Sequence, residues 1–282
     1  MSYLDWLRRL AAGGAEKDRL GTARLIDQRA RERARDAIEL ATPVSLGRPV
    51  GATVGRDRRP DFSIETYAAP LPGTPLAFAF DRVESEAHGL ANTHVDAANH
   101  VLLEGASYAN WAADDPAAPS IADLAGAGLF TRGVYVDVPA LLEVGWVPID
   151  EPVTGEHLDR ALGGLFEPGD ALLVEVGRDR FAAAGGDLWS MADGLGGLGP
   201  SAAEWIADHG VSILCWDFAD SRKPTDPPVP VHSLIWALGL VIVDNCTFAG
   251  LRGAAKRTGA LVVAPPATPG GTGALVNPLL VL

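Results

Sequence analysis

The chain has 282 residues, of which 23 are Lys or Arg and 36 are Asp or Glu, so its formal net charge is −13. This surplus of negative charge excludes a protein that binds nucleic acid or an anionic membrane through its overall field, because phosphates would be repelled. Hydrophobic residues form 48% of the chain and charged residues 21%, which excludes global disorder and allows one sizeable core.

The first fifty residues are predicted to be a peripheral helical arm. Residues 18–40 alternate arginines with acidic residues at helical spacing, a pattern typical of a solvated helix face. Packing against a partner subunit is the functional alternative for this arm. Residues 1–10 carry charges where a secretory leader would be apolar, and the longest uncharged apolar run, residues 233–243, is shorter than a membrane span of about 20 residues. We therefore expect a cytoplasmic protein without a membrane partner.

From about residue 76 the chain changes to short runs rich in branched residues. These strand-sized runs cover residues 76–80, 133–138, 171–176, 211–216, 240–243 and 261–263. Residues 154–162 and 201–209 are predicted helices, with Thr154 and Ser201 as N-caps and Glu204 completing a capping box. Strands that alternate with helices predict the α/β class, and the Pro- and Gly-rich connections also allow antiparallel pairs. We expect one domain over residues 51–282, after the arm of residues 1–50.

The two cysteines and two glycine-rich loops carry no predicted chemistry. Cys215 and Cys246 lie in or beside apolar runs and form no Cys-x-x-Cys pair, which favours buried thiols. The loop at residues 270–273 lacks the lysine of a Walker loop, and residues 194–199 lack the preceding strand that a dinucleotide site needs. A nucleotide cofactor is therefore not predicted.

Candidate chemistry concentrates in residues 88–100, which hold three of the six histidines. Imidazole and carboxylate are the ligands that suit zinc, manganese or iron. His94 and Asp96 are two residues apart, so both point to one side of an extended strand. Asp96 and His100 are four apart, so a helix that begins near Asp96 would also bring them to one face. A buried hydrogen-bond network that holds a turn is the alternative.

This segment resembles the hallmark of the cyclase family of metal-dependent hydrolases, which includes bacterial kynurenine formamidases and isatin hydrolases. The family pattern His-x-Gly-Thr-His-x-Asp-x-Pro-x-His, laid on residues 90–100, matches at Thr93, His94, Asp96 and His100 and departs at Leu90, Asn92 and Ala98. A branch of the family writes the motif as His-Gly-x-x-x-Thr-His-x-Asp-Ala, and in that form His88 takes the lead position.

The resemblance extends over most of the chain from Asp18 onward. The family's later histidine, with a carboxylate twelve residues further on, corresponds to His232 and Asp244, where Asp stands in place of the usual Glu. The resemblance implies a swivelling β/β/α fold with a barrel-like mixed sheet. It also implies a homo-oligomer, a dimer or larger, in which N-terminal arms exchange.

The resemblance further implies one or two divalent ions, zinc or manganese, and a role for each site residue. The implied metal ligands are His94, Asp96, His232 and Asp244. His88 is the candidate for the ligand lost at Leu90, and contact with the substrate or a structural role stays open for it. His100 is the implied general acid/base.

Three further residues are candidates for contact with the substrate. Asp217 follows a predicted strand, which is where α/β proteins place ligands, and Asp220 shares this position; each is equally suited to cap a turn. Trp216 and Tyr108 are candidates for the wall of an apolar pocket, with ordinary core packing as the alternative.

The function implied is metal-dependent hydrolysis of a small amide, formamide or lactam C–N bond, with water activated by the metal. No Gly-x-Ser-x-Gly elbow is present to suggest a serine nucleophile. Two alternatives are motivated by departures from the family pattern: the first by those at Leu90 and Asp244, and the second by that at Leu90 together with the arginine-rich arm. One is a natural-product cyclase or dehydratase on the same fold with a weakened or absent metal, and the other is a non-catalytic binding or assembly module.

Overall fold

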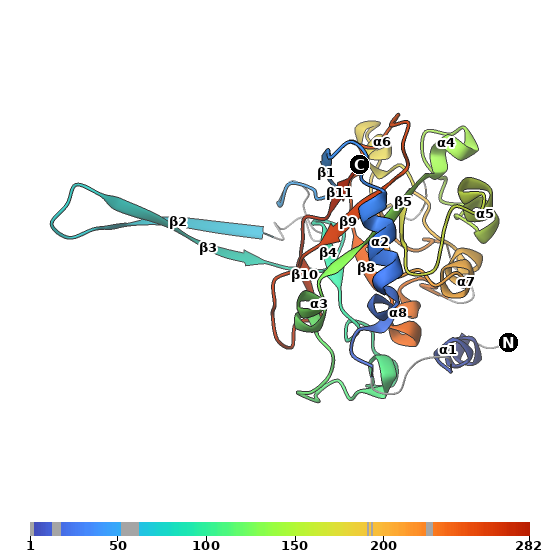
Figure 1. Ribbon diagram of the computed structural model, residues 1–282, viewed down its shortest axis with the longest axis horizontal. Coiled ribbons are helices and arrows are strands. Elements are labelled where there is room, and N and C mark those ends of the chain that lie inside the picture. The colour runs from blue at the N-terminus through green and yellow to red at the C-terminus, as the bar shows by residue number, and fades with distance from the viewer. Residues whose placement is uncertain (1–2, 13–17, 52–61, 191, 193, 224–227) are drawn as a thin grey trace.

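The computed structural model describes residues 3–12, 18–51, 62–190, 192, 194–223 and 228–282. Nine strands form the main sheet: β1 (Pro43–Ser45), β4 (His94–Asp96), β5 (Leu129–Asp137), β6 (Ala171–Glu175), β7 (Ile213–Trp216), β8 (Val241–Asp244), β9 (Thr258–Val263), β10 (Gly273–Leu275) and β11 (Leu279–Val281). Their order is β1-β11-β9-β5-β6-β7-β8-β4-β10, and the sheet curls into a half-barrel (Figure 1).

Helices cover this sheet. The described α-helices are α1 (Tyr3–Ala11), α2 (Gln28–Asp36), α3 (Ile121–Ala127), α4 (Val138–Leu142), α5 (Gly155–Leu162), α6 (Arg178–Ala183), α7 (Pro200–Asp208) and α8 (Ser233–Leu238). The predicted α/β class with a barrel-like mixed sheet is therefore confirmed. Within the described ranges no helix has both the length and the apolar character needed to cross a membrane.

The four central strands, β5 to β8, are parallel and separate two cores. Leu172 and Val174 join one core with α5, α7 and α8, while Leu173 and Cys215 join the other. A strand buried on both faces needs apolar residues at every position, which is why the predicted strands read as continuous apolar runs. Both cysteines are buried and free, as expected.

The predicted strands and helices are recovered, with one cap corrected. Thr154 caps α5 by accepting a hydrogen bond from the His157 N–H at 3.2 Å. Ser201 is not a cap, because α7 begins one residue earlier with Pro200 in its first turn and Gly199 as N-cap. Proline suits the first helical position, where its missing N–H has no intrahelical partner to lose.

The described parts of residues 1–50 contain separate short helices. Residues 18–40 contain a 3₁₀ helix at Gly21–Leu25 and then α2, which Asp27 caps through the N–H of Ala30. Helix α2 packs on β5 and β9, and α1 packs on α8. The described parts of the predicted arm therefore lie on the body of their own chain.

A different segment projects from the body. Strands β2 (Phe62–Pro70) and β3 (Ala77–Ser85) form a separate two-stranded antiparallel sheet that extends far from the half-barrel (Figure 1). The strand predicted at residues 76–80 is the start of β3. The partner strand at residues 62–70 was not predicted, because it lacks an alternation between buried and exposed positions.

Candidate metal centre

The candidate site lies where β4 pairs with the end of β8. In this antiparallel register His94 lies directly opposite Asp244. Residues directly opposite each other share a face of a sheet, and so do residues two apart on one strand. The side chains of His94, Asp96 and Asp244 therefore project from the same face, next to the carboxyl ends of the parallel strands.

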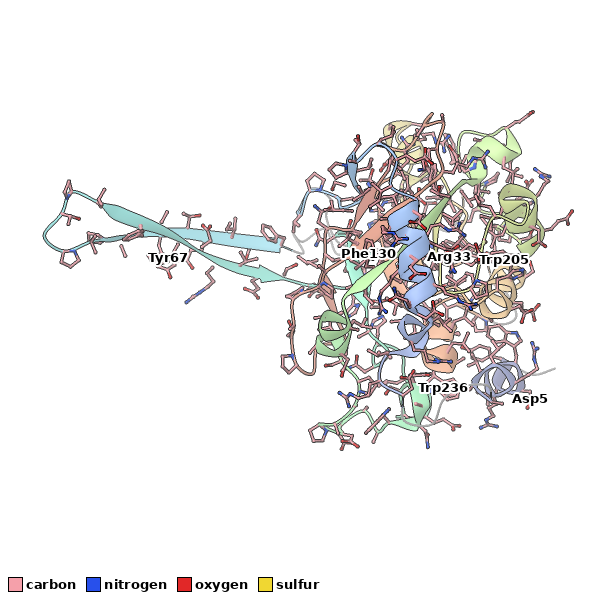
Figure 2. All side chains as sticks on the ribbon, viewed as in Figure 1. Asp5, Arg33, Tyr67, Phe130, Trp205 and Trp236 are labelled. Atoms are coloured by element: carbon pink, nitrogen blue, oxygen red, sulfur yellow. The ribbon has the colours of Figure 1, made fainter. Side chains whose placement is uncertain are left out.

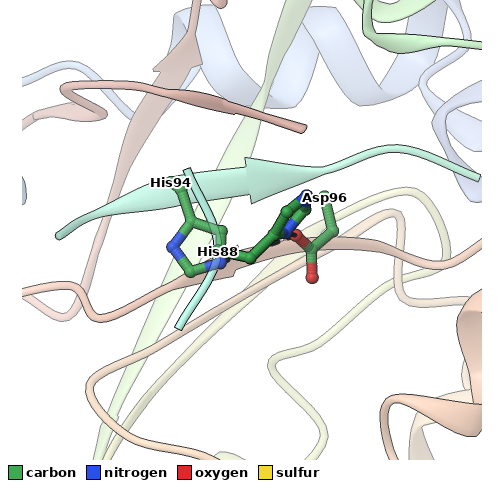
Figure 3. A group of neighbouring side chains, drawn as sticks. All are labelled: His88, His94 and Asp96. Carbon is green, nitrogen blue, oxygen red and sulfur yellow. Dashed lines mark ion pairs between the residues drawn. The ribbon is translucent and has the colours of Figure 1, made fainter. Parts of the chain in front are cut away.

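His88 reaches the same place from the loop before β4. Its Nδ1 lies 2.9 Å from Asp96 Oδ1 (Figure 3). Its Nε2 lies 2.9 Å from Thr272 Oγ1. Gly89 has a φ of +105°, which turns the chain back toward β4. A Cβ added at Gly273 would lie 2.6 Å from His88 Cε1. Gly89 thus allows the turn that brings His88 to β4, and the missing side chain of Gly273 leaves space for the His88 ring.

The Leu90 side chain is not part of the cluster formed by His88, His94, Asp96 and Asp244. Its side chain packs against the helix-covered core, and its carbonyl oxygen accepts a hydrogen bond from Arg178. The bend at Gly89 brings His88, two residues before Leu90, beside Asp96.

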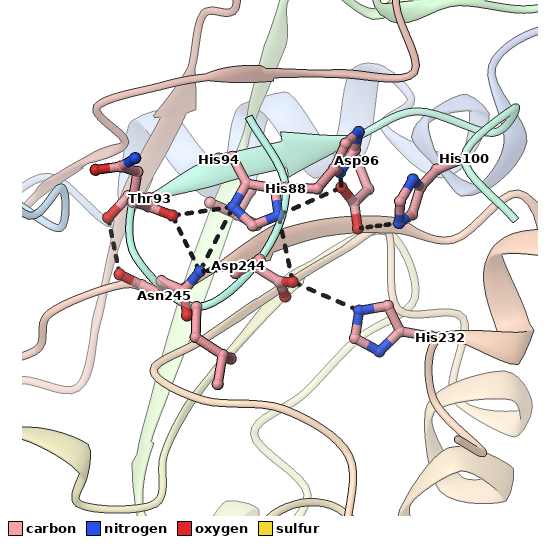
Figure 4. A network of polar contacts seen from close by, with 12 residues as sticks. His88, Thr93, His94, Asp96, His100, His232, Asp244 and Asn245 are labelled. Atoms are coloured by element: carbon pink, nitrogen blue, oxygen red, sulfur yellow. Dashed lines mark hydrogen bonds and ion pairs between the residues drawn. The ribbon is translucent and has the colours of Figure 1, made fainter. Parts of the chain in front are cut away.

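Two sets of three ligand residues share Asp96. One set is His88, His94 and Asp96, and the other is Asp96, His232 and Asp244; in each set the ligand atoms lie within 4.8 Å of one another. His94 Nε2 is 3.6 Å from Asp96 Oδ1, and Asp244 Oδ2 is 3.5 Å from His94 Nε2 and 3.4 Å from His232 Nε2 (Figure 4). Asp96 could therefore bridge two cations.

The state of Asp96 fits a bound cation. Its side chain is fully buried, and neither carboxylate oxygen has a hydrogen-bond partner among the described residues; the Nδ1 atom of His88 lacks one as well. Burial acts to raise the pKa of Asp96, but contact with His88 and the charges of the other imidazoles outweigh it and hold that pKa below its usual value. Burying a carboxylate costs several kcal/mol, roughly, unless it is compensated, and a divalent cation between Asp96 and the imidazoles would add to the compensation that His88 supplies.

His100 lies at the edge of this group in a tight turn. Its N–H donates to the Ala97 carbonyl at 2.9 Å, so the helix predicted to begin near Asp96 is wrong. The chain stays extended one residue past β4, because the Ala97 N–H pairs with Thr272, and then turns. His100 Nε2 lies 3.8 Å from Asp96 Oδ2, and its ring stacks on His88 with centroids 3.9 Å apart. Burial lowers the pKa of His100, which favours the neutral imidazole.

Asp220, which follows a predicted strand, lies behind His232 and orients it. Asp220 Oδ2 lies 2.5 Å from His232 Nδ1, while its Oδ1 accepts the Val231 N–H at 2.6 Å. This leaves Nε2 of His232 directed toward Asp244. A carboxylate behind a histidine fixes the ring and its tautomer. Its place just after a predicted strand was the signal in the sequence, but the pairing with His232, twelve residues further on, comes from the structure.

We predict that Asp220→Asn weakens metal binding about 10- to 100-fold without unfolding the protein. The amide keeps a partner for the Val231 N–H but removes the charge that holds His232. Titration of the metal-free protein with zinc, followed by calorimetry, measures the change. Asp187→Asn is the matched control, because this exposed turn residue bonds the Trp189 N–H far from the site. Equal affinities in the two variants would contradict the role of Asp220.

Trp216 belongs to the site in a different way from the one expected. It is fully buried, and its Nε1 donates a hydrogen bond to Asp244 Oδ1. Its ring lies 5.4 Å from that of His232, measured between centroids. This geometry lets Trp216 orient a metal ligand rather than form an open pocket wall.

Asp217 and Tyr108 belong to neither set of candidate ligand residues, which we call together the ligand group. The Asp217 carboxylate accepts the backbone N–H groups of residues 176, 177 and 178 at 2.7–3.0 Å, and burial raises its pKa to about 6. Tyr108 is buried, and its hydroxyl bonds Asp18 at 3.1 Å and Arg24 at 3.3 Å. These contacts use the polar atoms that a substrate would need, so they do not support the substrate contacts expected for either residue.

A buried arginine holds the loop that carries His88. Arg178 is 1% exposed and donates hydrogen bonds to the Leu90 carbonyl and to Asn245 Oδ1. Asn245 Nδ2 in turn donates to the carbonyls of Gly89 at 2.6 Å and Asn92 at 3.0 Å (Figure 4). Burial lowers the pKa of Arg178 to about 9, so it remains a cation at neutral pH. Neither Arg178 nor Asn245 stood out in the sequence, because each acts through backbone groups about 90 to 150 positions away.

Comparisons with known proteins identify the family of this chain and structures of similar fold. The sequence model of a family described as "Putative cyclase" matches residues 38–221, which is more than half of the chain. A search of curated proteins finds no match.

Solved structures share the fold at low sequence identity. A novel cyclase is 20% identical, with 94% of this chain and 95% of that chain covered and a TM-score of 0.77. Isatin hydrolase A from Labrenzia aggregata, bound to benzyl benzoate, is 18% identical over 88% and 96% of the two chains, with a TM-score of 0.60. A predicted metal-dependent hydrolase from Bacillus stearothermophilus is 16% identical over 85% and 97%, with a TM-score of 0.52.

Proposed function

The chain belongs to the cyclase family, and from this premise we propose that it is a metal-dependent hydrolase that cleaves the C–N bond of a small amide, formamide or lactam. One observation carries the proposal: two sets of histidine and aspartate side chains share a buried Asp96, whose oxygens face imidazole nitrogens, the nearest being His88 Nδ1 at 2.9 Å. Similar folds in proteins described as isatin hydrolase and metal-dependent hydrolase support it.

The proposed ligands are His88, His94, Asp96, His232 and Asp244, and the proposed ion is zinc or manganese. Imidazole and carboxylate ligands suit both metals. When bound, a divalent ion supplies a Lewis acid for the substrate carbonyl and lowers the pKa of water from 15.7 to about 7. The supporting contacts from Asp220 to His232 and from Trp216 to Asp244 keep two of the ligands oriented.

His100 is the proposed proton carrier. Its imidazole is 27% exposed at the edge of the ligand group, so it is accessible from solvent and still beside Asp96. Because burial lowers its pKa, the neutral ring is available to accept a proton from the attacking water. The same ring then donates that proton to the leaving nitrogen. Asp96, 3.8 Å away, stabilises the imidazolium between the two transfers.

We also propose that the protein acts on a small molecule in the cytoplasm and assembles as a homo-oligomer. The net charge of −13 disfavours nucleic acid as a partner. The further alternative of a cyclase or dehydratase with a weakened metal arose from the loss at Leu90 and from Asp244, which stands in place of the usual Glu. Because His88 lies 2.9 Å from Asp96, that loss no longer argues against a complete ligand set, and hydrolysis is the function we prefer.

The test combines elemental analysis with a screen of N-formyl and lactam compounds. We expect about one or two zinc or manganese ions per chain, activity that disappears on chelation, and recovery when the metal is restored. His100→Gln is expected to keep the metal and lose about 10²- to 10⁴-fold in turnover, because proton transfer alone is removed.

His209→Gln is the matched control, since His209 stacks on Trp205 outside the ligand group. Full activity after complete chelation would reject hydrolysis by a metal and favour the cyclase or dehydratase. A well-folded protein that takes up no metal would reject the site itself.

A further inference from the structure

The glycine-rich loop of residues 269–273 lies against His88. Strand β10 begins at Gly273, which pairs with Asp96 of β4. The carbonyl of Thr272 accepts a backbone N–H from the residue that follows β4, at 2.9 Å. These backbone contacts fix the end of the loop beside the candidate metal centre and place Thr272 Oγ1 2.9 Å from His88 Nε2. A loop for which the sequence predicted no chemistry therefore contacts a candidate metal ligand.

Two other candidate ligands, His94 and His232, keep Nε2 available for a cation. Nδ1 of His94 lies 2.9 Å from the Asn92 carbonyl oxygen, and Nδ1 of His232 lies 2.5 Å from Asp220 Oδ2. A carbonyl and an ionised carboxylate accept hydrogen bonds but cannot donate them, so Nδ1 carries the proton in both rings. The Nε2 atom of each neutral ring is then left without a proton, as a metal ligand requires.

His88 presents its other nitrogen to the ligand group. Its Nδ1 lies 2.9 Å from Asp96 Oδ1, while its Nε2 faces Thr272. If the ring were rotated by half a turn, Cδ2 would lie against Asp96 and Cε1 against Thr272, and both polar contacts would be lost. A Cβ at Gly273 would lie 2.6 Å from His88 Cε1, so this position of the ring also depends on that glycine.

The spacing of the facing atoms suits a cation between them. Ligand atoms at about 2.0–2.2 Å from a tetrahedral zinc ion lie roughly 3.3–3.6 Å apart. Asp96 Oδ1 is 2.9 Å from His88 Nδ1 and 3.6 Å from His94 Nε2. Both distances lie within about 0.5 Å of the spacing that a tetrahedral ion needs. Nδ1 is therefore the atom through which His88 can complete this set.

We propose that Thr272 is a positioning residue, which holds the His88 ring so that this histidine binds metal through Nδ1, whereas His94 and His232 bind through Nε2. The inference rests on the proposed function, because it requires a bound cation. With the cation on Nδ1, Nε2 of His88 carries the proton and donates it to Thr272 Oγ1. The His100 ring stacks on the same imidazole, with centroids 3.9 Å and planes 11° apart, so Thr272 also helps to place the proposed proton carrier.

The first test identifies the nitrogen that binds metal in each histidine. Protein labelled with ¹⁵N-histidine and loaded with ¹¹³Cd²⁺ as a substitute for zinc shows a one-bond coupling only at nitrogens bound to the ion. We expect coupling at Nδ1 of His88 and at Nε2 of His94 and His232. His88→Asn lacks one labelled ring and so assigns the signals of His88.

The pattern of couplings separates this inference from the proposed function. Coupling at Nε2 of His88, or coupling at His94 and His232 without any at His88, would overturn the inference and leave the metal centre in place. A protein in which no histidine couples to cadmium would reject the metal centre and this inference together.

The second test measures the effect of the Thr272 hydroxyl on zinc affinity. Thr272→Val keeps the branched shape of the side chain but cannot accept the bond from His88. We expect zinc to bind about 10-fold more weakly, the lower end of the range for such supporting contacts, because this hydrogen bond is exposed. Thr272→Ser keeps the hydroxyl and is expected to bind zinc like the wild type. Unchanged affinity in Thr272→Val, or an equal loss in Thr272→Ser, would overturn the positioning role.

Thr66→Val is the matched control. Thr66 Oγ1 donates to Asp81 Oδ1 at 2.6 Å, so this variant also removes a hydrogen bond of an exposed threonine. The residue precedes Tyr67 on the projecting hairpin, which Figure 2 shows well away from the body. We expect its zinc affinity to equal that of the wild type, and circular dichroism checks that every variant keeps its fold. An equal loss of affinity in Thr66→Val and Thr272→Val would show that the loss does not depend on His88, and would overturn the inference.

Discussion

Asp96→Asn is expected to remove the bound metal and to lower hydrolytic activity at least about 1,000-fold. Asp96 belongs to both sets of ligand residues, so its loss weakens both cation positions at once. The amide keeps the size of the side chain but removes the negative charge and leaves only one oxygen to coordinate. Without the cation, the pKa of water stays at 15.7 instead of falling to about 7, so hardly any hydroxide is available at neutral pH. Elemental analysis and turnover of the best substrate from the screen measure the two losses.

Asp170→Asn is the matched control for Asp96→Asn. Asp170 is equally buried, but it lies before β6, at the opposite end of the sheet, where it pairs with Arg33 and Arg132. Its replacement is expected to lower the stability of the fold and to leave the metal content unchanged. If Asp96→Asn kept its full metal content, the assignment of Asp96 as a shared ligand would be wrong.

Arg178→Leu is expected to lower the free energy of unfolding by about 3 kcal/mol or more. The change leaves the Leu90 carbonyl and Asn245 Oδ1 without their donor in a buried setting. It also releases the loop that positions His88, so the metal should bind about 10- to 100-fold more weakly. Urea denaturation with and without metal, together with metal titration of the folded variant, separates the two effects.

Arg35→Leu provides the comparison for this prediction. Arg35 lies on α2, with a side chain that is 68% exposed and pairs only with its neighbour Asp36. Exposed pairs of this kind contribute little to stability, so a change within about 1 kcal/mol is expected. Stability and metal affinity that stay unchanged in Arg178→Leu would show that the His88 loop does not need this anchor.

Sequence patterns predicted the local elements of the fold well. The central strands were recognised because each is buried on both faces and must be apolar at every position. The cap of α5 was recognised because Thr154 and the helix it caps are neighbours in the chain. The cap of α7 was misplaced by two residues, since Pro200 takes the first position of that helix. The hairpin partner at residues 62–70 was missed, because a strand exposed on both faces leaves no alternating pattern.

The chain by itself determined which residue types are available for metal chemistry and the two-residue spacing that puts His94 and Asp96 on one side of a strand. Only the tertiary structure decided which other residues complete the candidate metal centre around His94 and Asp96. The pairing of β4 with β8 brings Asp244 opposite His94, the bend at Gly89 brings in His88, and Asp220 turns His232 toward the group. Spacing along a strand is a local property of the backbone, whereas these contacts join residues far apart in sequence, whose meeting depends on the register and packing of the whole sheet.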